Sequence, residues 1–518
     1  MINGTFETHL TGWDHDRAAL AAFAAEHGLG YVYIELDRGF TRHQPMLTLP
    51  GSGTLEQQHA MVRDWCARLK KAGIRPTRTK IEAAPWSTGV PDTDRAASAE
   101  PDGRYFEHHV KVRLPSAAVA DLLALTDLSE AHGARLSRNA RRRDTDGGEE
   151  RFVNQRCHKV GRATATERLD RLVAALRTAG HDVASVEQEY VVYDSNLDLD
   201  QGWLNAAPPP EPWVTKWEQR NLPAPAASRA YPATYQPLRR GWDVAQRAAF
   251  DPALKQHGNA FTAGEPVFAD PELGQRWKDA RRSAMRHLLT VIAGIKWANH
   301  LVLRGSSTMA SWVGTAAREP GDLDFVVVPP AMTSGSADAE ALLADLTAAV
   351  AATPGAGLRP ERTTQSAIWT YERADGRRLV IPFTGHSIPD GIVQLDLVFG
   401  ESLPIPPEPI TVLGVDLPGA ATAELSLAWK LLWLATDRYP QGKDLYDAVL
   451  LAEYTTVDLG LVRELMRPEL RELADEFTAA TVLSWRDVDW ANFAAEYPGV
   501  EGTAEQWLRR LALALDRS

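Results

Sequence analysis

Cysteine is scarce in this sequence, and several other marks of particular protein classes are missing. Only Cys66 and Cys157 occur among 518 residues, too few for a disulfide framework or a zinc–thiolate site. We expect both thiols to be buried and inert. No apolar run approaches the roughly 18 residues of a membrane-spanning helix. The first residues, MINGTFETHL, have neither the basic start nor the apolar centre of a secretion signal. We therefore expect a cytoplasmic protein that does not associate with membranes.

An excess of basic residues is also missing. The chain has 56 Lys and Arg residues against 68 Asp and Glu residues, a formal net charge of −12. This balance argues against a uniformly basic nucleic-acid-binding protein, although it permits local basic patches. A hydrophobic content of 44% and a charged content of 24% are typical of globular proteins. The length exceeds what one core usually supports, so we expect at least two domains.

Proline is concentrated in one stretch, residues 208–237, with the sequence PPPEPWVTKWEQRNLPAPAASRAYPATYQP. So many prolines exclude a regular helix or a central strand. The aromatic residues within the stretch favour a strap packed on a surface over a free tether. The sequence therefore predicts a domain over residues 1–204, a linker or strap over 205–245, and a second domain over 246–518.

The first of these domains contains an internal repeat. FETHLTG from Phe6 matches FEHHVKV from Phe106, and ARLKKAGIRPTRTKIE from Ala67 matches AALRTAGHDVASVEQE from Ala174. Each copy, about 1–88 and 104–196, has the periodicity of a strand, a helix, two strands, a helix and a strand. This order predicts a duplicated ferredoxin-like βαββαβ unit. We expect its two antiparallel sheets to be packed or joined side by side, with Gly73 and Gly180 capping helix ends.

Histidines recur in the repeat: His9 and His109 take the same position in the first strand of each copy, and His43 and His158 lie near matching strands. One interpretation is a two-histidine phosphodiesterase, in which the pair acts as general acid and base. The simpler interpretation is that these are histidines on a sheet face with polar neighbours.

A basic segment, RLSRNARRR, falls on a predicted hairpin of the second copy. Basic hairpins bind phosphate backbones, but most charge runs are solvated surface. Contact with RNA is one hypothesis for this segment, whose arginines are Arg135, Arg138, Arg141, Arg142 and Arg143.

The second domain carries a more specific pattern. The strand LVLR leads into Gly305 and Ser306. Fifteen residues separate Ser306 from Asp322, where DLDFVVV begins another strand. Glycine lets the backbone approach a phosphate, while serine adds a hydroxyl beside the amides of a helix start. Because strand residues alternate between faces, Asp322 and Asp324 point to the same side. Paired carboxylates are costly to bury without a cation, so they indicate a divalent metal.

A third carboxylate is expected on a neighbouring strand. Asp396 lies in the apolar run GIVQLDLVFGE, where an unpaired charge would be expensive. We therefore predict that Asp396 completes the metal site together with Asp322 and Asp324.

The order Gly-Ser, then Asp-x-Asp after a short helix, resembles the nucleotidyltransferase superfamily. Further along, AELSLAWKLLWLATDRYPQGKDLYDAVLLAEY from Ala423 places Lys430 on one helix and Asp444 at the start of the next. These ordered motifs, over about residues 301–454, resemble the AbiEii/AbiGii-type nucleotidyltransferase toxins. The gap between Gly-Ser and Asp-x-Asp is longer than is usual in that family, and the duplicated N-terminal half lies outside its pattern.

The resemblance implies a function and a set of residue roles. Arg304, Gly305, Ser306 and Lys430 would bind the nucleoside triphosphate, two Mg²⁺ ions would be held by Asp322, Asp324 and Asp396, and Asp444 would join the site from a helical lobe beginning at about residue 421. A nucleoside monophosphate would pass to an acceptor, in this family often the 3′ end of a tRNA, as a toxin activity with a cognate antitoxin as a further partner.

Alternatives remain at the sequence level. The acceptor is a protein or a small molecule in other members of the superfamily, and a third hypothesis makes the protein a non-catalytic binding module. Lys430 is alternatively a surface lysine, and Asp444 alternatively the N-cap of its helix. The fold class expected overall is α+β, with a duplicated ferredoxin-like half, a nucleotidyltransferase α/β core and a helical C-terminal lobe.

Overall fold

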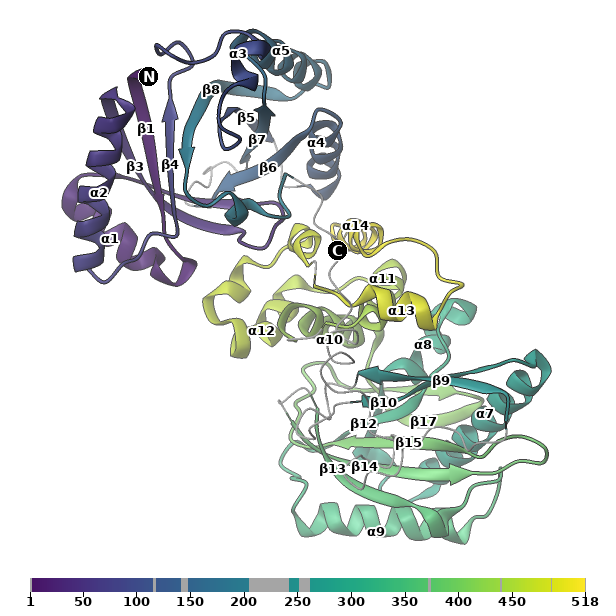
Figure 1. The fold of residues 1–518 in the computed structure, drawn as a ribbon. Helices are drawn as coiled ribbons and strands as arrows, with labels where there is room; N and C mark the ends of the chain where they lie inside the picture. Colours follow the sequence, from purple (N-terminus) through teal and green to yellow (C-terminus); the bar gives the residue numbers. More distant parts are fainter. Residues whose placement is uncertain are drawn as a thin grey trace. The chain divides into compact units, whose positions relative to one another are not determined.

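A computed structural model describes residues 2–114, 118–140, 148–204, 242–250, 261–370, 374–437, 440–485 and 487–517. The chain divides into two compact units, Met1–Pro210 and Glu211–Ser518, both drawn in Figure 1. Helices and strands are mixed in each unit, as the α+β expectation requires.

The N-terminal unit repeats one order of elements. Its first half contains β1 (Asn3–Thr11), α1 (Arg17–His27), β2 (Gly30–Leu36), β3 (His43–Thr54), α2 (Leu55–Lys71) and β4 (Arg78–Ala83). After α3 (Asp94–Ser98), the second half contains β5 (Tyr105–Leu114), α4 (Val119–Ala131), β6 (Ala134–Asn139), β7 (Glu149–His158), α5 (Arg162–Thr178) and β8 (Asp182–Asp194).

Local sequence explains where the helices of this unit begin and end. Thr54 caps α2, accepting a hydrogen bond from the backbone of Gln57, whose side chain bonds back to the backbone of Thr54. Gly73 and Gly180 follow α2 and α5 with φ of 82° and 85°. A glycine adopts this left-handed conformation at little cost, so each helix stops there.

The eight strands form one closed barrel in the order β1-β3-β2-β6-β7-β5-β8-β4. The expectation of two sheets packed or joined side by side is therefore wrong. Two antiparallel pairings join the halves: β2 with β6, where Leu36 is opposite Ser137, and β4 with β8, where Lys80 is opposite Asp194. Closure satisfies the backbone groups that would be exposed at both edges of a separate sheet.

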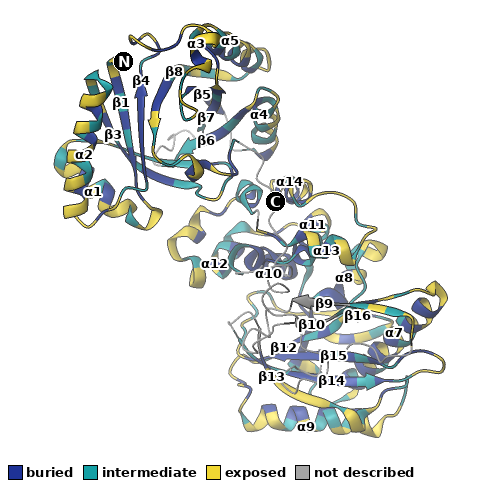
Figure 2. Ribbon diagram, viewed as in Figure 1, coloured by how far each residue is buried: buried dark blue, intermediate teal, exposed yellow. Residues whose placement is uncertain are grey.

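The apolar core of this unit lies between the barrel and its helices. Phe6 and Leu10 of β1 belong to one buried cluster with Leu20 and Phe23 of α1. A second cluster joins strands of the other half to α4 and α5. Figure 2 shows this burial along the strands and the exposed outer faces of α1 and α2. Since successive strand residues point to opposite faces, the residues between these apolar ones face the interior of the barrel.

The first part of the C-terminal unit contains its described strands and three α-helices. In chain order these are β9 (Val244–Phe250), β10 (Phe261–Phe268), α7 (Pro271–Gly294), β11 (Leu301–Arg304), α8 (Ser306–Val313), β12 (Asp322–Val327), α9 (Ala337–Ala352), β13 (Thr364–Thr370), β14 (Ala374–Phe383), β15 (Gly391–Val398), β16 (Glu408–Val412) and β17 (Val415–Ala420). The helices that follow are α10 (Ala423–Thr436), α11 (Gly442–Tyr454), α12 (Leu459–Leu470), α13 (Trp490–Glu496) and α14 (Ala504–Leu515).

Seven of these strands form a sheet in the order β13-β14-β15-β12-β11-β17-β16, and β9 pairs with β10 separately. Helices α7 and α9 cover one face of the sheet. Leu288 of α7 and Leu342 of α9 share a buried cluster with Leu303 of β11, Phe325 of β12 and Leu397 of β15. Because these strand residues point toward α7 and α9, their immediate neighbours point to the opposite face.

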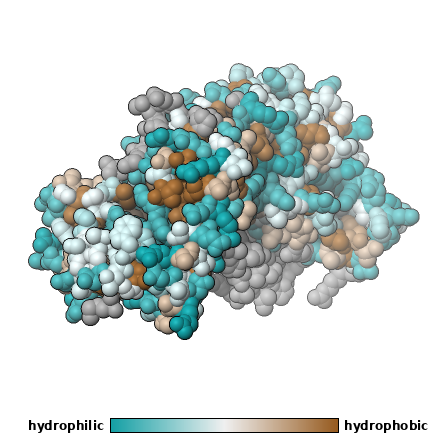
Figure 3. Space-filling view, turned by 90° about the horizontal axis from the view of Figure 1, so that it is seen from above, coloured by the Kyte–Doolittle hydropathy of each residue, from teal (hydrophilic) through white to brown (hydrophobic). Residues whose placement is uncertain are grey.

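The helices after β17 pack on one another, and α11 contacts both α8 and α14. Ten successive residues of α10, Leu425–Leu434, are buried, so this helix is enclosed on all sides. None of the helices in the described part of the chain is long and apolar enough to cross a lipid bilayer. On the face drawn in Figure 3, hydrophobic residues form small groups among hydrophilic ones.

Candidate active site

The aspartates of β12 lie on the sheet face away from α7 and α9. Leu323 and Phe325 belong to the core on the helix-covered face, so Asp322 and Asp324 project from the other one. Strand β15 runs parallel to β12, and its Asp396 is directly opposite Asp324 in the register. The structure thus brings the three predicted carboxylates onto one face of two neighbouring strands.

Gly305 joins β11 to α8 at the position that brings the helix start against these carboxylates. Its φ is 81°, and a Cβ atom there would lie 2.6 Å from Oδ2 of Asp324. Only glycine fits both constraints. The first amide groups of a helix have no partner within it and commonly bind phosphate. Ser306, buried at the first position of α8, contributes one of these amides beside Asp324.

Negative charge is concentrated around Asp324. Burial first, and then the charges of Asp322 and Asp396, raise the pKa of Asp324 to about 8, although Arg304 and Lys443 act in the opposite direction. A raised carboxyl pKa means that the ionised form is disfavoured where it stands. A bound cation would remove that penalty.

Asp396 is held by an arginine. Nε and Nη2 of Arg378 on β14 donate to its Oδ1 and Oδ2 over 2.8 and 2.7 Å, and Nε2 of Gln394 donates to Oδ2 over 3.1 Å. Arg378 is opposite Asp396 in the β14–β15 register. The predicted third ligand therefore lies beside Asp324, but both of its oxygens already accept hydrogen bonds from this pair.

Lys430 and Asp444, predicted from the helical motifs, contact each other. The ammonium of Lys430 lies 2.7 Å from Oδ1 of Asp444 and 3.2 Å from Oδ2 of Asp447, and Nη2 of Arg318 donates to Asp447 over 2.9 Å. Burial opposes the charge of Lys430, but Asp444 and Asp447 outweigh it and raise the pKa of the ammonium. The ion pairs among these residues hold α10, α11 and the segment before β12 together.

This network excludes two of the simpler interpretations. Lys430 is 6% exposed, so it is not a surface lysine. Helix α11 begins at Gly442 with Gln441 as its N-cap residue, so Asp444 is not the cap. Both side chains are committed to a buried ion pair.

Arg304, expected to contact nucleotide, is held between β11 and the helical lobe. Its Nη1 lies 2.7 Å from Oε2 of Glu401, and its guanidinium carbon lies 5.1 and 5.8 Å from the ring centres of Trp429 and Trp433. Cation–π contacts at such distances stabilise a buried arginine. Arg304 is also directly opposite Asp324 in the β11–β12 register.

Lys443 was missed among the predicted residues. It lies in the first turn of α11, is only partly buried, and its charge acts on Asp324. The signal was present in the sequence QGKDLYD, because Lys443 immediately precedes Asp444.

The basic hairpin is only partly described. On β6, Arg135 forms an ion pair with Glu130, and Nη2 of Arg138 lies 2.6 Å from Oε2 of Glu35. Both arginines thus already have carboxylate partners. Residues 141–143 of the same segment and the Pro-rich stretch 208–237 lie outside the described residues.

The two cysteines differ in burial. Cys157 is buried, as expected, whereas Cys66 is only partly buried. Burial raises the pKa of both thiols, which disfavours the reactive thiolate.

The geometry suits the binding of a polyphosphate with divalent cations. A helix N-terminus faces a group of carboxylates, with Lys443 and Arg304 close by. Comparison with known proteins agrees. Residues 286–511 match the family described as "Nucleotidyl transferase AbiEii toxin, Type IV TA system", and no curated protein matches the chain. The match begins within α7 and ends within α14, so the C-terminal half of the chain is similar to an AbiEii nucleotidyltransferase toxin domain.

Proposed function

We propose that this protein transfers a nucleoside monophosphate from a nucleoside triphosphate to a hydroxyl group of an RNA acceptor, with the 3′ end of a tRNA as the first candidate. The observation that carries the proposal is the juxtaposition of Gly305 with Asp324, beside Asp322 and Asp396. Phosphate-binding amides and carboxylates that suit a divalent cation meet at one point of the fold.

The carboxylates fit Mg²⁺. Oxygen ligands are what Mg²⁺ prefers, and burial together with the charges of Asp322 and Asp396 raises the pKa of Asp324, which a bound cation would offset. Asp322 and Asp324 would hold the ions. Asp396 would contribute a further oxygen ligand while keeping part of its contact with Arg378. When bound, the ions neutralise triphosphate charge and favour ionisation of the attacking hydroxyl.

The protein groups have distinct tasks in this proposal. Amides at the start of α8 hold the triphosphate, and Lys443 offsets charge that develops on the departing pyrophosphate. The acceptor oxygen forms a bond to the α-phosphorus while the bond from that phosphorus to the bridging oxygen breaks. Pyrophosphate leaves, and the hydroxyl proton passes to a carboxylate of the site.

We assign Lys430 and Asp444 a positioning role. Both are buried in one ion-pair network with Asp447 and Arg318, and the charge of Asp322 acts on Arg318. The network therefore connects the helical lobe to the strand that carries the aspartates. Direct contact between Lys430 and a phosphate would require its ammonium to share or leave these two carboxylates.

The N-terminal unit is proposed to select the acceptor. Its halves have the strand orders β4-β1-β3-β2 and β8-β5-β7-β6 within the barrel, which supports descent from a duplicated ferredoxin-like unit. The family description, a type IV toxin–antitoxin system, makes an antitoxin the expected protein partner.

The test is incubation of the full chain with Mg²⁺, each α-labelled nucleoside triphosphate, and either total RNA or RNA-free lysate. Label is expected on RNA, and Asp322→Asn should abolish it. Asp338→Asn is the matched control, since it makes the same chemical change at an exposed position of α9. Label on protein or on a small molecule would show that the acceptor is not RNA, while leaving the transfer activity itself supported. No label on any fraction would contradict the transfer activity.

A further inference from the structure

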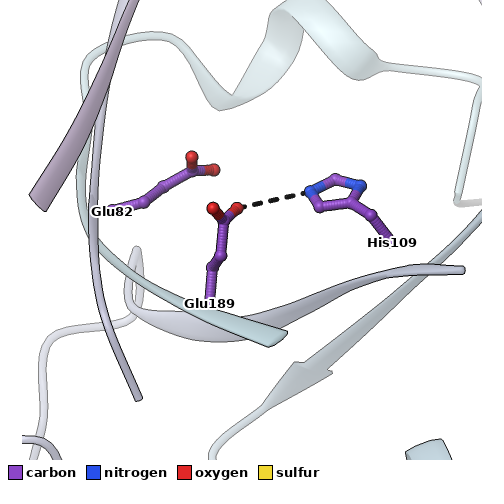
Figure 4. A group of neighbouring side chains, drawn as sticks. All are labelled: Glu82, His109 and Glu189. Atoms are coloured by element: carbon purple, nitrogen blue, oxygen red, sulfur yellow. Dashed lines mark ion pairs between the residues drawn. The ribbon is translucent and has the colours of Figure 1, made fainter. Parts of the chain in front are cut away.

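The interior of the N-terminal barrel contains a second group of ligand-forming side chains. Glu82, His109 and Glu189 come from the neighbouring strands β4, β5 and β8. One ligand atom from each lies within 4.8 Å of the others. Figure 4 shows the three side chains converging, with the ion pair between His109 and Glu189 marked. The nucleotidyltransferase site uses none of them.

The group follows the internal repeat. In the matched segments of the two copies, His9 corresponds to His109 and Glu82 to Glu189. Nε2 of His9 lies 3.0 Å from Oε2 of Glu82, and Nε2 of His109 lies 3.5 Å from Oε2 of Glu189. Two equivalent His–Glu pairs therefore meet inside one barrel. Duplication explains why two carboxylates and two imidazoles are found together.

The imidazoles are oriented by their other ring nitrogens. Nδ1 of His109 is 2.7 Å from Oδ1 of Asn154, and Nδ1 of His9 is 3.2 Å from Oγ1 of Thr48. Oδ1 of Asn154 is an acceptor, so it receives the proton of Nδ1. Nε2 is then directed at Glu189, the arrangement found around metal-binding histidines.

Glu82 is a buried carboxylate with two cationic neighbours. It is 1% exposed, and each of its carboxylate oxygens forms an ion pair. Its close neighbours are the ammonium of Lys80, 2.6 Å from Oε1, and His9. Lys80 also contacts Glu107. Lys80 would therefore keep a carboxylate partner if an ion bound Glu82.

We propose that the barrel interior binds one divalent transition-metal ion through Glu82, His109 and Glu189, with His9 beside it as the fourth candidate ligand. A mixed set of imidazoles and carboxylates favours Zn²⁺ and neighbouring first-row ions over Mg²⁺. Ligand atoms at about 2.0–2.2 Å from such an ion require the three side chains to move slightly toward one another. The four strands that contribute ligands would then be cross-linked.

The test uses the full chain carrying Asp322→Asn and Asp324→Asn, so that binding at the nucleotidyltransferase site does not interfere. The protein is dialysed against EDTA and titrated with Zn²⁺ by calorimetry and with Co²⁺ by visible absorption. We expect one equivalent to bind. Removing a ligand by Glu189→Gln or His109→Gln should weaken binding by at least about tenfold, since loss of supporting contacts alone costs that much.

Glu35→Gln is the matched control. It also removes one carboxylate charge from the barrel, at a residue paired with Arg42 and Arg138, and it should retain the full equivalent. Circular dichroism identifies any variant that does not fold. If one ligand variant does not fold, the metal affinity of the other one tests the proposal. Failure to bind either ion stoichiometrically, or equal affinity in the folded ligand variants, would show an internal ion-pair cluster and overturn the proposal. Nucleotide transfer by the unmodified protein is unaffected by that outcome.

Discussion

Replacing Asp324 by Asn should stabilise the metal-free protein while abolishing nucleotide transfer. The carboxyl group has its pKa raised from 3.8 to about 8 by burial and by Asp322 and Asp396. Between these two pH values the folded state holds a proton that the unfolded state has released. The free energy of unfolding therefore falls as the pH rises toward 8, and it levels off above that value.

The size of this effect follows from the interval between the two pKa values. At about 1.4 kcal/mol per pH unit, the full interval corresponds to about 6 kcal/mol, and a rise from pH 5 to pH 8 to about 4 kcal/mol. For a unit of this size, about 2 °C in Tm accompanies each kcal/mol. The expected difference is several degrees.

The assay is a series of thermal melts in EDTA from pH 5 to pH 8 for the unmodified protein, Asp324→Asn and the control Asp338→Asn. From pH 5 to pH 8, the Tm of the unmodified protein and of the control should fall by several degrees more than the Tm of Asp324→Asn. Added Mg²⁺ at pH 8 should restore stability to the first two and have little effect on Asp324→Asn. Equal pH dependence in all three, or equal stabilisation by Mg²⁺, would refute the electrostatic reasoning.

Three further predictions concern other parts of the site and chain. Gly305→Ala should cost about 1–3 kcal/mol in urea unfolding and abolish binding of a fluorescent nucleoside triphosphate, because the new Cβ meets Asp324; normal binding would contradict the close approach. Lys430→Met should cost about 3–5 kcal/mol, because buried Asp444 loses its cation and Asp447 keeps only Arg318 of its two cationic partners. Lys443→Met should change stability by less than about 0.5 kcal/mol yet lower kcat/KM. If instead Lys443→Met destabilised the protein and Lys430→Met lowered only kcat/KM, the positioning role would belong to Lys443 and the role at the phosphates to Lys430. The fragment 211–518 should bind triphosphate and lose preference for one acceptor, as measured by competition between RNA and protein; unchanged preference would remove the N-terminal unit from acceptor selection.

The sequence alone predicted the parts of the site that follow from local rules. Alternation along β12 placed Asp322 and Asp324 on the same side, the cost of an unpaired charge in an apolar run singled out Asp396, and close approach of the backbone to a phosphate singled out Gly305. Each of these inferences needs only a few consecutive residues, because a strand has a period of two and a helix start has a fixed set of unpaired amides.

What the sequence did not predict depends on pairings between distant segments. Barrel closure needs β2 to meet β6 and β4 to meet β8, and no local pattern encodes these partners. The contact between Asp396 and Arg378 depends on the register of β14 with β15. The burial of Lys430 depends on two carboxylates from the next helix.

Barrel closure also limits how a partner can attach by its backbone. Many protein partners bind by adding a strand to a sheet, which requires an edge strand with unpaired amide and carbonyl groups. The eight strands of the barrel present no such edge, so a partner of the N-terminal unit must be recognised through side chains, helices and connecting segments. In the seven-stranded sheet the edge strands are β13 and β16, and Ser311 of α8 already donates to the carbonyl oxygen of Thr411 on β16. An antitoxin that worked by strand addition would therefore be directed to β13, next to β14 and the arginine that holds Asp396.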